Sequence, residues 1–331
     1  FLQSGRFSSA AKGARLCVSS AAGRQRERGT ALARAYAALV LVGFVWGANY
    51  IYIKIATAAI SPMQVVFLRV VAGFLPLAIM AWRAGVLNRG QLRHLPHFAV
   101  MSVLATSFYY YGFVAGTALL PSSVAGLLGG AIPIVTFLTS LVALRSERPN
   151  ALTATGVALG FAGILLTARP WESGGTVSPL GVAWVMAGTI SVGVSFVYAR
   201  RFLAPLNLSA LALATWQTGL AALTLAVITD YHGMSAILDD GRALAALVVG
   251  LGLLGTGLAY LIYYYMVQRL GAMGASGATY LGVVVAVFFG AAVGETVTAV
   301  EYAALVLILG GVALIQIGGR RAARRVAVRP D

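Results

Sequence analysis

Residues 106–166, TSFYYYGFVAGTALLPSSVAGLLGGAIPIVTFLTSLVALRSERPNALTATGVALGFAGILL, decide the fold because the chain repeats this pattern at residues 256–314. The offset is about 150 residues, which aligns Tyr110 with Tyr260. Each copy has an aromatic apolar segment, a polar break, a Gly/Ala-rich apolar segment, an acidic turn and a last apolar segment with paired small residues. Similarity at a fixed offset indicates an internal structural repeat.

The composition is that of a membrane protein. Only 10% of the 331 residues are charged and 60% are hydrophobic, whereas a soluble domain has about 25% charged residues. The mean hydropathy is +0.87. Apolar runs of about 20 residues cross the hydrocarbon as helices, which satisfy their own backbone polar groups. About ten runs meet this criterion: 33–58, 62–82, 97–118, 122–144, 152–168, 180–199, 210–228, 244–267, 276–293 and 302–317.

The basic residues predict the topology. With a cytoplasmic amino terminus, the tails and loops on that side contain all of the 24 Lys and Arg residues except Lys54, Arg69, Arg169 and Arg242. This bias places both termini in the cytoplasm and requires an even number of spans. The predicted fold is an all-α polytopic membrane protein with ten transmembrane helices in two inverted five-helix repeats. Inverted repeats are typical of transporters with a midplane site between the repeats.

Four segments are expected along the chain. They are a disordered basic N-terminal arm (1–32), a first repeat with helices 1–5 (33–169), a second repeat with helices 6–10 (178–318) and a basic C-terminal tail (319–331). The arm is rich in Ser, Ala, Gly and Arg and has almost no apolar run to bury. A targeting segment is the alternative, because the Arg/Ser-rich, acid-poor composition is similar to that of transit peptides.

Several function classes lack sequence support. The chain has no HExxH, GxSxG or GxxxxGK[ST] motif, and its one cysteine, Cys17, supplies no disulfide or cysteine metal site. We therefore expect no enzyme activity, no catalytic residue, no cofactor and no metal. The basic residues lie in tails and loops, so no nucleic-acid partner is expected. The expected partners are a small-molecule substrate and the lipid bilayer, with monomer and homodimer both open.

The few ionisable residues near the spans have two interpretations each. Arg69 and Lys54 either hold a substrate carboxylate or extend as snorkelling cations to the interface. Glu147 and Glu295 precede helices, where the N-terminal dipole favours a carboxylate, and a proton-carrying role is the alternative. No acid is clearly placed in mid-membrane. We therefore expect a facilitator or a weakly coupled transporter.

Polar and aromatic side chains predict the cavity lining. Trp46, Asn49 and Tyr50 are spaced i, i+3 and i+4, so they share one face of the first span. The repeat match favours a cavity position for Tyr110 and Tyr260, whereas an aromatic belt is the alternative. The predicted cavity residues are Trp46, Asn49, Tyr50, Tyr110, Ser195, Tyr198 and Tyr260. For residues 263–265, YYY, a belt at the interface is expected.

Helix-breaking and small residues predict where the bundle bends and packs. Pro121 and Pro133 break or kink the fourth span. Gly277 and Gly282 in the ninth span are expected to provide similar flexibility for gating. Paired small residues four apart allow close helix packing, and they occur at Gly43/Gly47, Gly112/Gly116, Gly126/Gly130, Gly156/Gly160, Ser191/Ser195 and Gly290/Gly294.

The segments WGANYIYIK, SPMQVVFLRVVAG, ALLPSSVAGLLGGAIPIVTFLTSLVALRSER and LGAMGASGATYLGVVVAVFFGAAVGE resemble the two EamA repeats of the drug/metabolite transporter superfamily, near its YddG-type amino-acid exporters. The resemblance covers about residues 35–318. The family pattern falls on Trp46 and Gly47 in the first span, on Arg69, on Pro133 and on the acidic turns at Glu147 and Glu295. The chain departs from it with RSER at the first turn and with no proline in the ninth span.

The resemblance implies export of amino acids or related small metabolites across a bacterial inner membrane by alternating access. An aromatic cavity with Asn and Ser side chains suits zwitterions or neutral amphiphiles better than polyanions, which need several converging cations. The same lining also serves lipophilic drugs, so a multidrug exporter is the alternative. A non-transporting membrane scaffold or an intramembrane enzyme is the alternative from another class.

Overall fold

The computed structural model describes residues 34–35, 37–143, 150–169 and 177–327. Residues Phe1–Ala38 form one unit and Leu39–Asp331 form a second. The predicted N-terminal arm at 1–32 and the acidic residue Glu147 lie outside the described residues.

Helices account for nearly all of the described chain, and this part contains no strand. The α-helices are α2 (Pro62–Arg83), α3 (Leu95–Ser102), α4 (Phe108–Ala118), α5 (Ser122–Gly129), α6 (Ile132–Ala143), α7 (Ala151–Ala168), α8 (Pro179–Tyr198), α9 (Ala210–Ile228), α10 (Gly241–Ala245), α11 (Ala259–Ser276), α12 (Ala278–Ala292) and α13 (Ala299–Ala327). The 3-10 segments are η1 (Arg89–His94), η4 (Ala204–Leu206) and η5 (Met234–Asp239). The π-helical segments are η2 (Val103–Ser107), η3 (Ala199–Leu203) and η6 (Ala246–Leu258).

These elements join into ten helical spans that are long and apolar enough to cross a membrane, as predicted. In chain order the described spans are Ala37–Thr57, Pro62–Arg83, Arg89–Ala118, Ser122–Ala143, Ala151–Ala168, Pro179–Leu206, Ala210–Ile228, Gly241–Ala272, Gly274–Ala292 and Ala299–Gly318. The third span begins earlier than predicted because η1 and α3 precede the π-helical segment in one continuous rod.

Serine and asparagine caps fix where several spans begin. The Ser61 side chain accepts from the backbone N–H of Gln64, and the Gln64 side chain accepts from the backbone N–H of Ser61, which completes a capping box. Ser209 caps α9 and Asn150 caps α7 in the same way, each through the N–H three residues later. Such caps satisfy backbone donors that the helix itself leaves free.

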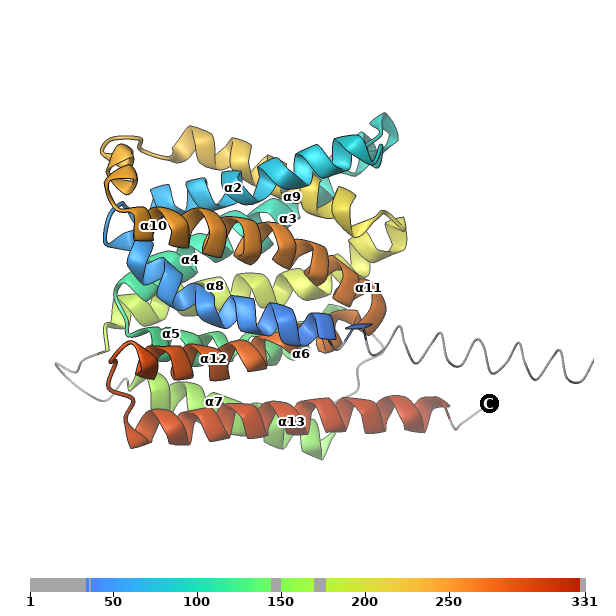
Figure 1. Cartoon of the computed structure of the whole chain (residues 1–331). Helices are drawn as coiled ribbons and strands as arrows, with labels where there is room; N and C mark the ends of the chain where they lie inside the picture. The colour runs from blue at the N-terminus through green and yellow to red at the C-terminus, as the bar shows by residue number, and fades with distance from the viewer. Residues whose placement is uncertain (1–33, 36, 144–149, 170–176, 328–331) are drawn as a thin grey trace, which may run out of the picture. The chain divides into compact units, whose positions relative to one another are not determined.

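The spans pack in pairs that follow the repeat. The second span packs against the eighth, and the repeat counterparts of these two, the seventh and the third, also pack together. Likewise the third span packs against the sixth, and their repeat counterparts, the eighth and the first, are in contact. In Figure 1, α7 and α13 run side by side, as do α2 and α9. Each pair joins one repeat to the other. This pattern fits the inverted two-repeat fold, whose core is the interface between the repeats.

Small residues set the closest of these contacts. A Cβ added at Gly112 on α4 would lie 2.6 Å from the backbone oxygen of Trp184 on α8. A Cβ added at Gly43 would lie 2.7 Å from the oxygen of Ala278, at the start of α12. Helices that approach so closely gain van der Waals contact along their backbones. The paired glycines therefore hold the repeats together, as the sequence predicts.

The fourth span is broken, as its prolines predict. Pro121 is the N-cap of α5, and the chain leaves the helix at Gly130 and Ala131 before α6 begins. Pro133 lies in the first turn of α6, where its missing N–H removes no helical hydrogen bond. The break interrupts the wall of the bundle next to Gly129 and Ile132, which line a cavity between the repeats.

Candidate functional site

A small cavity lies where the two repeats meet. It offers about 30 Å³ to the centres of water-sized molecules, which is room for about two waters. The conformation described here is therefore a narrow one. The lining residues are Trp46, Asn49, Tyr50, Ile53, Arg69, Tyr109, Tyr110, Phe113, Gly129, Ile132, Thr279 and Gly282.

The first span contributes the polar and aromatic face that its spacing predicts. Trp46, Asn49 and Tyr50 all line the cavity. The ring of Tyr50 lies 5.9 Å from that of Phe113 on α4. A side chain at Gly129, beside the break in the fourth span, would clash with the Tyr50 hydroxyl. The break and a glycine thus make room for an aromatic ring.

Arg69 on α2 is the charged group of the cavity. Its side chain is buried, with 1% exposure, so the snorkelling alternative is wrong. The guanidinium carbon lies 3.7 Å from the centre of the Tyr110 ring, and Nε donates to the Thr256 hydroxyl at 3.4 Å. A desolvated cation over an aromatic face is stabilised by the ring quadrupole. Arg69 Nη2 is buried and has no hydrogen-bond partner.

Asn49 presents a second unsatisfied group. Its side chain is buried and its Oδ1 has no hydrogen-bond partner. The amide packs against Gly255 on η6, where an added Cβ would lie 2.6 Å from Oδ1. The neighbouring residue on η6, Thr256, is the partner of Arg69. Two consecutive residues of η6 therefore contact Asn49 and Arg69.

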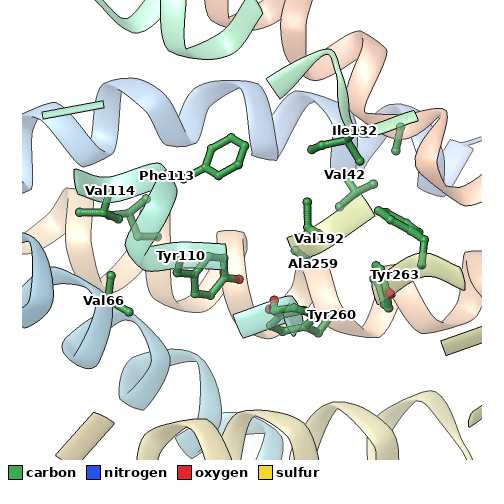
Figure 2. Packing of buried hydrophobic residues seen from close by; sticks show 14 of the residues in the cluster. Val42, Val66, Tyr110, Phe113, Val114, Ile132, Val192, Ala259, Tyr260 and Tyr263 are labelled. Atoms are coloured by element: carbon green, nitrogen blue, oxygen red, sulfur yellow. The ribbon is translucent and has the colours of Figure 1, made fainter. Parts of the chain in front are cut away.

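Tyrosines of α4 form the wall beside Arg69. Figure 2 shows Tyr110 on α4 next to Tyr260 on α11, with ring centres 6.1 Å apart. The Tyr110 hydroxyl donates to the backbone oxygen of Gly255 at 3.2 Å. The ring of Tyr109 packs at a tilt against that of Tyr110, with centres 4.9 Å apart. Tyr110 therefore lines the cavity, as predicted, and its ring also packs against the Arg69 guanidinium.

Tyr260 lies behind this wall rather than in it. It is buried, and its hydroxyl shares a hydrogen bond with the Thr106 hydroxyl at 2.9 Å and donates to the backbone oxygen of Ala105. Tyr260 is absent from the cavity lining in the described chain. Its repeat mate Tyr110 occupies the lining position instead.

Two further predicted cavity residues, Ser195 and Tyr198, lie on the sixth span. Ser195 is buried and donates to the oxygen of Val192 at 2.7 Å, a bond within its own helix. The Tyr198 hydroxyl is hydrogen-bonded to His97 Nδ1 at 2.7 Å. Neither lines the cavity in the conformation described.

The second half of the chain contains a counterpart of Arg69 that the sequence analysis missed. Arg69 and Gln217 each lie eight residues after a capping serine, Ser61 and Ser209. Gln217 Nε2 donates to the Thr106 hydroxyl at 2.7 Å, just as Arg69 donates to Thr256. Thr106 and Thr256 are themselves 150 residues apart in the repeat. The repeat therefore preserves the interaction and changes only the charge.

The EamA-like transporter family matches residues 33–169 and 179–317. This chain belongs to the EamA-like transporter family. Its two matched segments correspond to the two halves of the bundle, and both contribute residues to the cavity.

Relatives of this EamA-like transporter are named as transporters. The uncharacterized inner membrane transporter YedA of Escherichia coli K12 is 28% identical, over 86% of this chain and 90% of that protein. A probable terminal-alkyne amino-acid exporter of Streptantibioticus cattleyicolor is 27% identical, over 76% of this chain and 82% of that protein. A solved crystal structure with 20% identity covers 88% of this chain and 97% of its own, with a TM-score of 0.58. The structure supports the fold alone.

Within this EamA-like transporter, Glu295 differs from the sequence prediction. It was expected to favour the N-terminus of its own following helix, but it accepts from the backbone N–H groups of Ser122 and Ser123 at the start of α5, at 2.9 and 3.1 Å. Lys54 Nζ lies 3.1 Å from Glu295 Oε1. Because α5 and α12 pack together, the first N–H groups of α5, which have no partner within their own helix, lie close enough to donate to the Glu295 carboxylate.

The predicted aromatic belt is also wrong for two of its three tyrosines. Tyr263 and Tyr264 are each 1% exposed. The ring of Tyr263 packs 4.9 Å from Phe196, and the Tyr264 hydroxyl donates to Gln217 Oε1. Figure 2 shows Tyr263 among the buried residues of the hydrophobic cluster. Because the eighth span packs on several neighbours, this face is turned into the EamA-like bundle rather than toward lipid.

The predicted gating residues have different surroundings. Helix α12 runs unbroken through Gly282, which packs against the backbone of Gly43 and Gly47 and lines the cavity. Gly277 lies at the junction of α11 and α12, where an added Cβ would approach Gln316 Nε2 to 3.1 Å. Whether these glycines and Pro121 and Pro133 act in gating stays a prediction.

Proposed function

We propose that this EamA-like transporter exports neutral or aromatic amino acids, or related small metabolites, across a bacterial inner membrane by alternating access. The proposal rests on one observation above all. The cavity between the repeats combines a wall of aromatic rings with a single buried cation, Arg69, among its described lining residues. An apolar pocket with few oriented polar groups is what a small amphiphilic ligand requires.

The position of the cavity supports alternating access. It lies at the interface of two inverted repeats and receives residues from both, including Trp46 from the first and Gly282 from the second. Relative movement of the repeats would open it to one side or the other. The narrow volume described above fits an intermediate stage of such a movement.

The placement of the acids supports a facilitator or a weakly coupled transporter. The acids in the described chain are Asp230, Asp239, Asp240, Glu295 and Glu301, and all lie between spans or within the first turn of one. Intramembrane acids are the usual proton relays of coupled transporters. Collapse of the pH gradient, with the substrate gradient kept, should therefore leave flux unchanged.

The distribution of basic residues supports the proposed topology. The described Arg residues at one end of the bundle are Arg83, Arg89, Arg93, Arg200, Arg201 and Arg269. A basic end favours the cytoplasmic side, which would place both termini there. The relative from Escherichia coli is named an inner membrane transporter, which supports the same membrane for this chain.

The test is flux into proteoliposomes with labelled neutral, aromatic and charged amino acids, with and without a pH gradient. Saturable flux of neutral or aromatic amino acids that ignores the pH gradient supports the proposal. Flux of a lipophilic cation without any amino-acid flux would replace it with the multidrug exporter, which the same aromatic wall serves. A chain without saturable flux of either kind would favour the non-transporting scaffold.

A further inference from the structure

We propose that the cavity recognises the α-amino-acid head group at two points. The substrate carboxylate accepts a hydrogen bond from Arg69 Nη2, and the substrate ammonium donates to Asn49 Oδ1. This inference rests on the proposed function and names its substrate class: compounds that carry a free carboxylate and a free ammonium on one carbon, with an apolar or aromatic side chain.

The first support is the location of the unsatisfied groups. The described chain has eight buried side-chain N or O atoms without a hydrogen-bond partner. Only two of their residues line the cavity, Asn49 and Arg69. One atom is a cationic donor and the other is an acceptor. Buried polar groups are normally satisfied, so a ligand with the opposite pair of groups is the natural partner.

The second support is that the protein holds both side chains in place without satisfying them. Arg69 rests on the Tyr110 ring and is tied through Nε to Thr256. Asn49 is confined against Gly255, and Tyr110 donates to the oxygen of the same residue. All of these contacts converge on two consecutive residues of η6. Side chains fixed in this way lose little freedom when a ligand binds.

The third support is the asymmetry between the repeats. Gln217 occupies the position of Arg69 in the second repeat, but both ends of its amide are satisfied, by Thr106 and by Tyr264. The second half-site is therefore neutral and closed, and the first is charged and open. A substrate with one carboxylate consequently binds to one repeat and in one orientation.

The remaining lining residues suit the side chain of such a substrate. Tyr50, Tyr109 and Phe113 surround the same space as Arg69 and Asn49. Aromatic rings pack favourably on apolar and aromatic groups in edge-to-face or tilted arrangements. A second carboxylate or ammonium on the side chain would meet no further opposite charge among the described lining residues. Neutral side chains are therefore preferred.

The experiment uses the full chain in proteoliposomes with labelled L-phenylalanine as the probe. The competitors are L-phenylalanine methyl ester, which lacks the carboxylate, and N-acetyl-L-phenylalanine, which lacks the ammonium. Binding of each compound is measured in parallel by its effect on the melting temperature in detergent. Wild-type protein should bind both competitors at least tenfold more weakly than phenylalanine.

The variants separate the two contacts. Arg69→Gln gives the first repeat the residue of the second and should raise the KM for phenylalanine at least tenfold while removing the discrimination against the methyl ester. Asn49→Leu should instead remove the discrimination against the N-acetyl compound. Thr189→Val is the matched control, because Thr189 has a buried hydroxyl without a partner but lies outside the cavity lining. It should leave both discriminations unchanged.

The outcomes distinguish this inference from the proposed function. Saturable phenylalanine flux with equally effective competition by the methyl ester, or with discrimination that survives Arg69→Gln, would overturn the head-group site and leave amino-acid export standing. Absence of both flux and binding for the whole amino-acid panel would overturn both. A comparable rise in the KM for phenylalanine in Arg69→Lys, which keeps the charge but not the planar fork, at an unchanged melting temperature, would support the directed contact from Nη2.

Discussion

Replacement of Glu295 by glutamine tests how the two repeats are joined at one end of the bundle. The carboxylate accepts from the backbone of Ser122 and Ser123 and pairs with Lys54, at distances of 2.9, 3.1 and 3.1 Å. Glu295 belongs to the second repeat, whereas its three partners belong to the first. The variant keeps the size of the side chain and one acceptor oxygen but removes the charge.

The expected loss is about 1–2 kcal/mol of unfolding free energy. A carboxylate at a partly buried helix N-terminus contributes up to about 2 kcal/mol. The Lys54 side chain is 39% exposed, so its ion pair is screened by solvent and adds at most about 1 kcal/mol. The amide oxygen of glutamine still accepts one of the two backbone N–H groups, which offsets part of the loss.

The pH dependence identifies the cause. Burial by itself raises the pKa of Glu295, but the backbone N–H groups of Ser122 and Ser123 and the ammonium of Lys54 outweigh it and hold the pKa below its ordinary value of 4.5. A carboxyl with a depressed pKa stabilises the folded state above its ordinary pKa and loses that effect as the pH falls through the folded pKa. The difference between wild type and variant should be full at pH 7 and shrink below about pH 4.5.

The assay is thermal or denaturant unfolding in detergent at pH 7 and at steps below pH 5, with Lys54→Met as the matched control. Lys54→Met should cost less than Glu295→Gln, because it leaves both backbone contacts in place. Equal stability of Glu295→Gln and wild type at pH 7 would refute the reasoning. So would a difference that persists unchanged in acid, or a larger loss in Lys54→Met.

Three further substitutions test the cavity and the packing. Trp46→Ala and Asn49→Ala should each cut substrate flux while leaving the melting temperature in detergent nearly unchanged; a loss of several kcal/mol of stability in both would make them packing residues. Gly112→Ala should cost about 1–3 kcal/mol, because the new Cβ would lie 2.6 Å from the oxygen of Trp184. Gly310→Ala is its control, since no atom lies within 4 Å of that Cβ, and equal melting of the two variants would contradict the close-packing argument.

The features that sequence predicts well are those set within one helix. The ten spans follow from runs of apolar residues, and the shared face of Trp46, Asn49 and Tyr50 follows from 3.6 residues per turn. The break in the fourth span follows from the chemistry of Pro133. In each case the decisive residues lie within a few turns of one another, so no knowledge of neighbouring helices is needed.

The features that sequence predicts poorly depend on partners from distant spans. The sequence alone is compatible with both a snorkelling and a buried Arg69. The contacts of its guanidinium with Tyr110 and Thr256 show that it is buried. Glu295 caps a helix that begins at Ser122, 173 positions earlier in the sequence. Phe113 entered the cavity wall without any sequence signal, because only the crossing of α4 and the first span brings its ring to Tyr50.

The sequence contains the correspondence between Arg69 and Gln217, but only a repeat offset of 148 residues aligns them. Thr106 and Thr256 are 150 residues apart, whereas the capping serines Ser61 and Ser209 are 148 apart. With the larger offset, Arg69 aligns with Gly219 and the polar match is lost. The caps fix the register of the two helices, so capping residues are the better markers for aligning repeats of this kind.

The two repeats must therefore be nearly equivalent in packing, but they need not be equivalent in charge. Packing must be nearly equivalent in both halves, because an inverted repeat exchanges its interfaces when the bundle opens to the other side. The arginine and glutamine bonds to threonine meet that requirement. A charge needs no such equivalence, and two cations buried in one bundle would repel each other in a medium of low dielectric constant. One arginine and one satisfied glutamine avoid that repulsion while keeping the geometry of both halves.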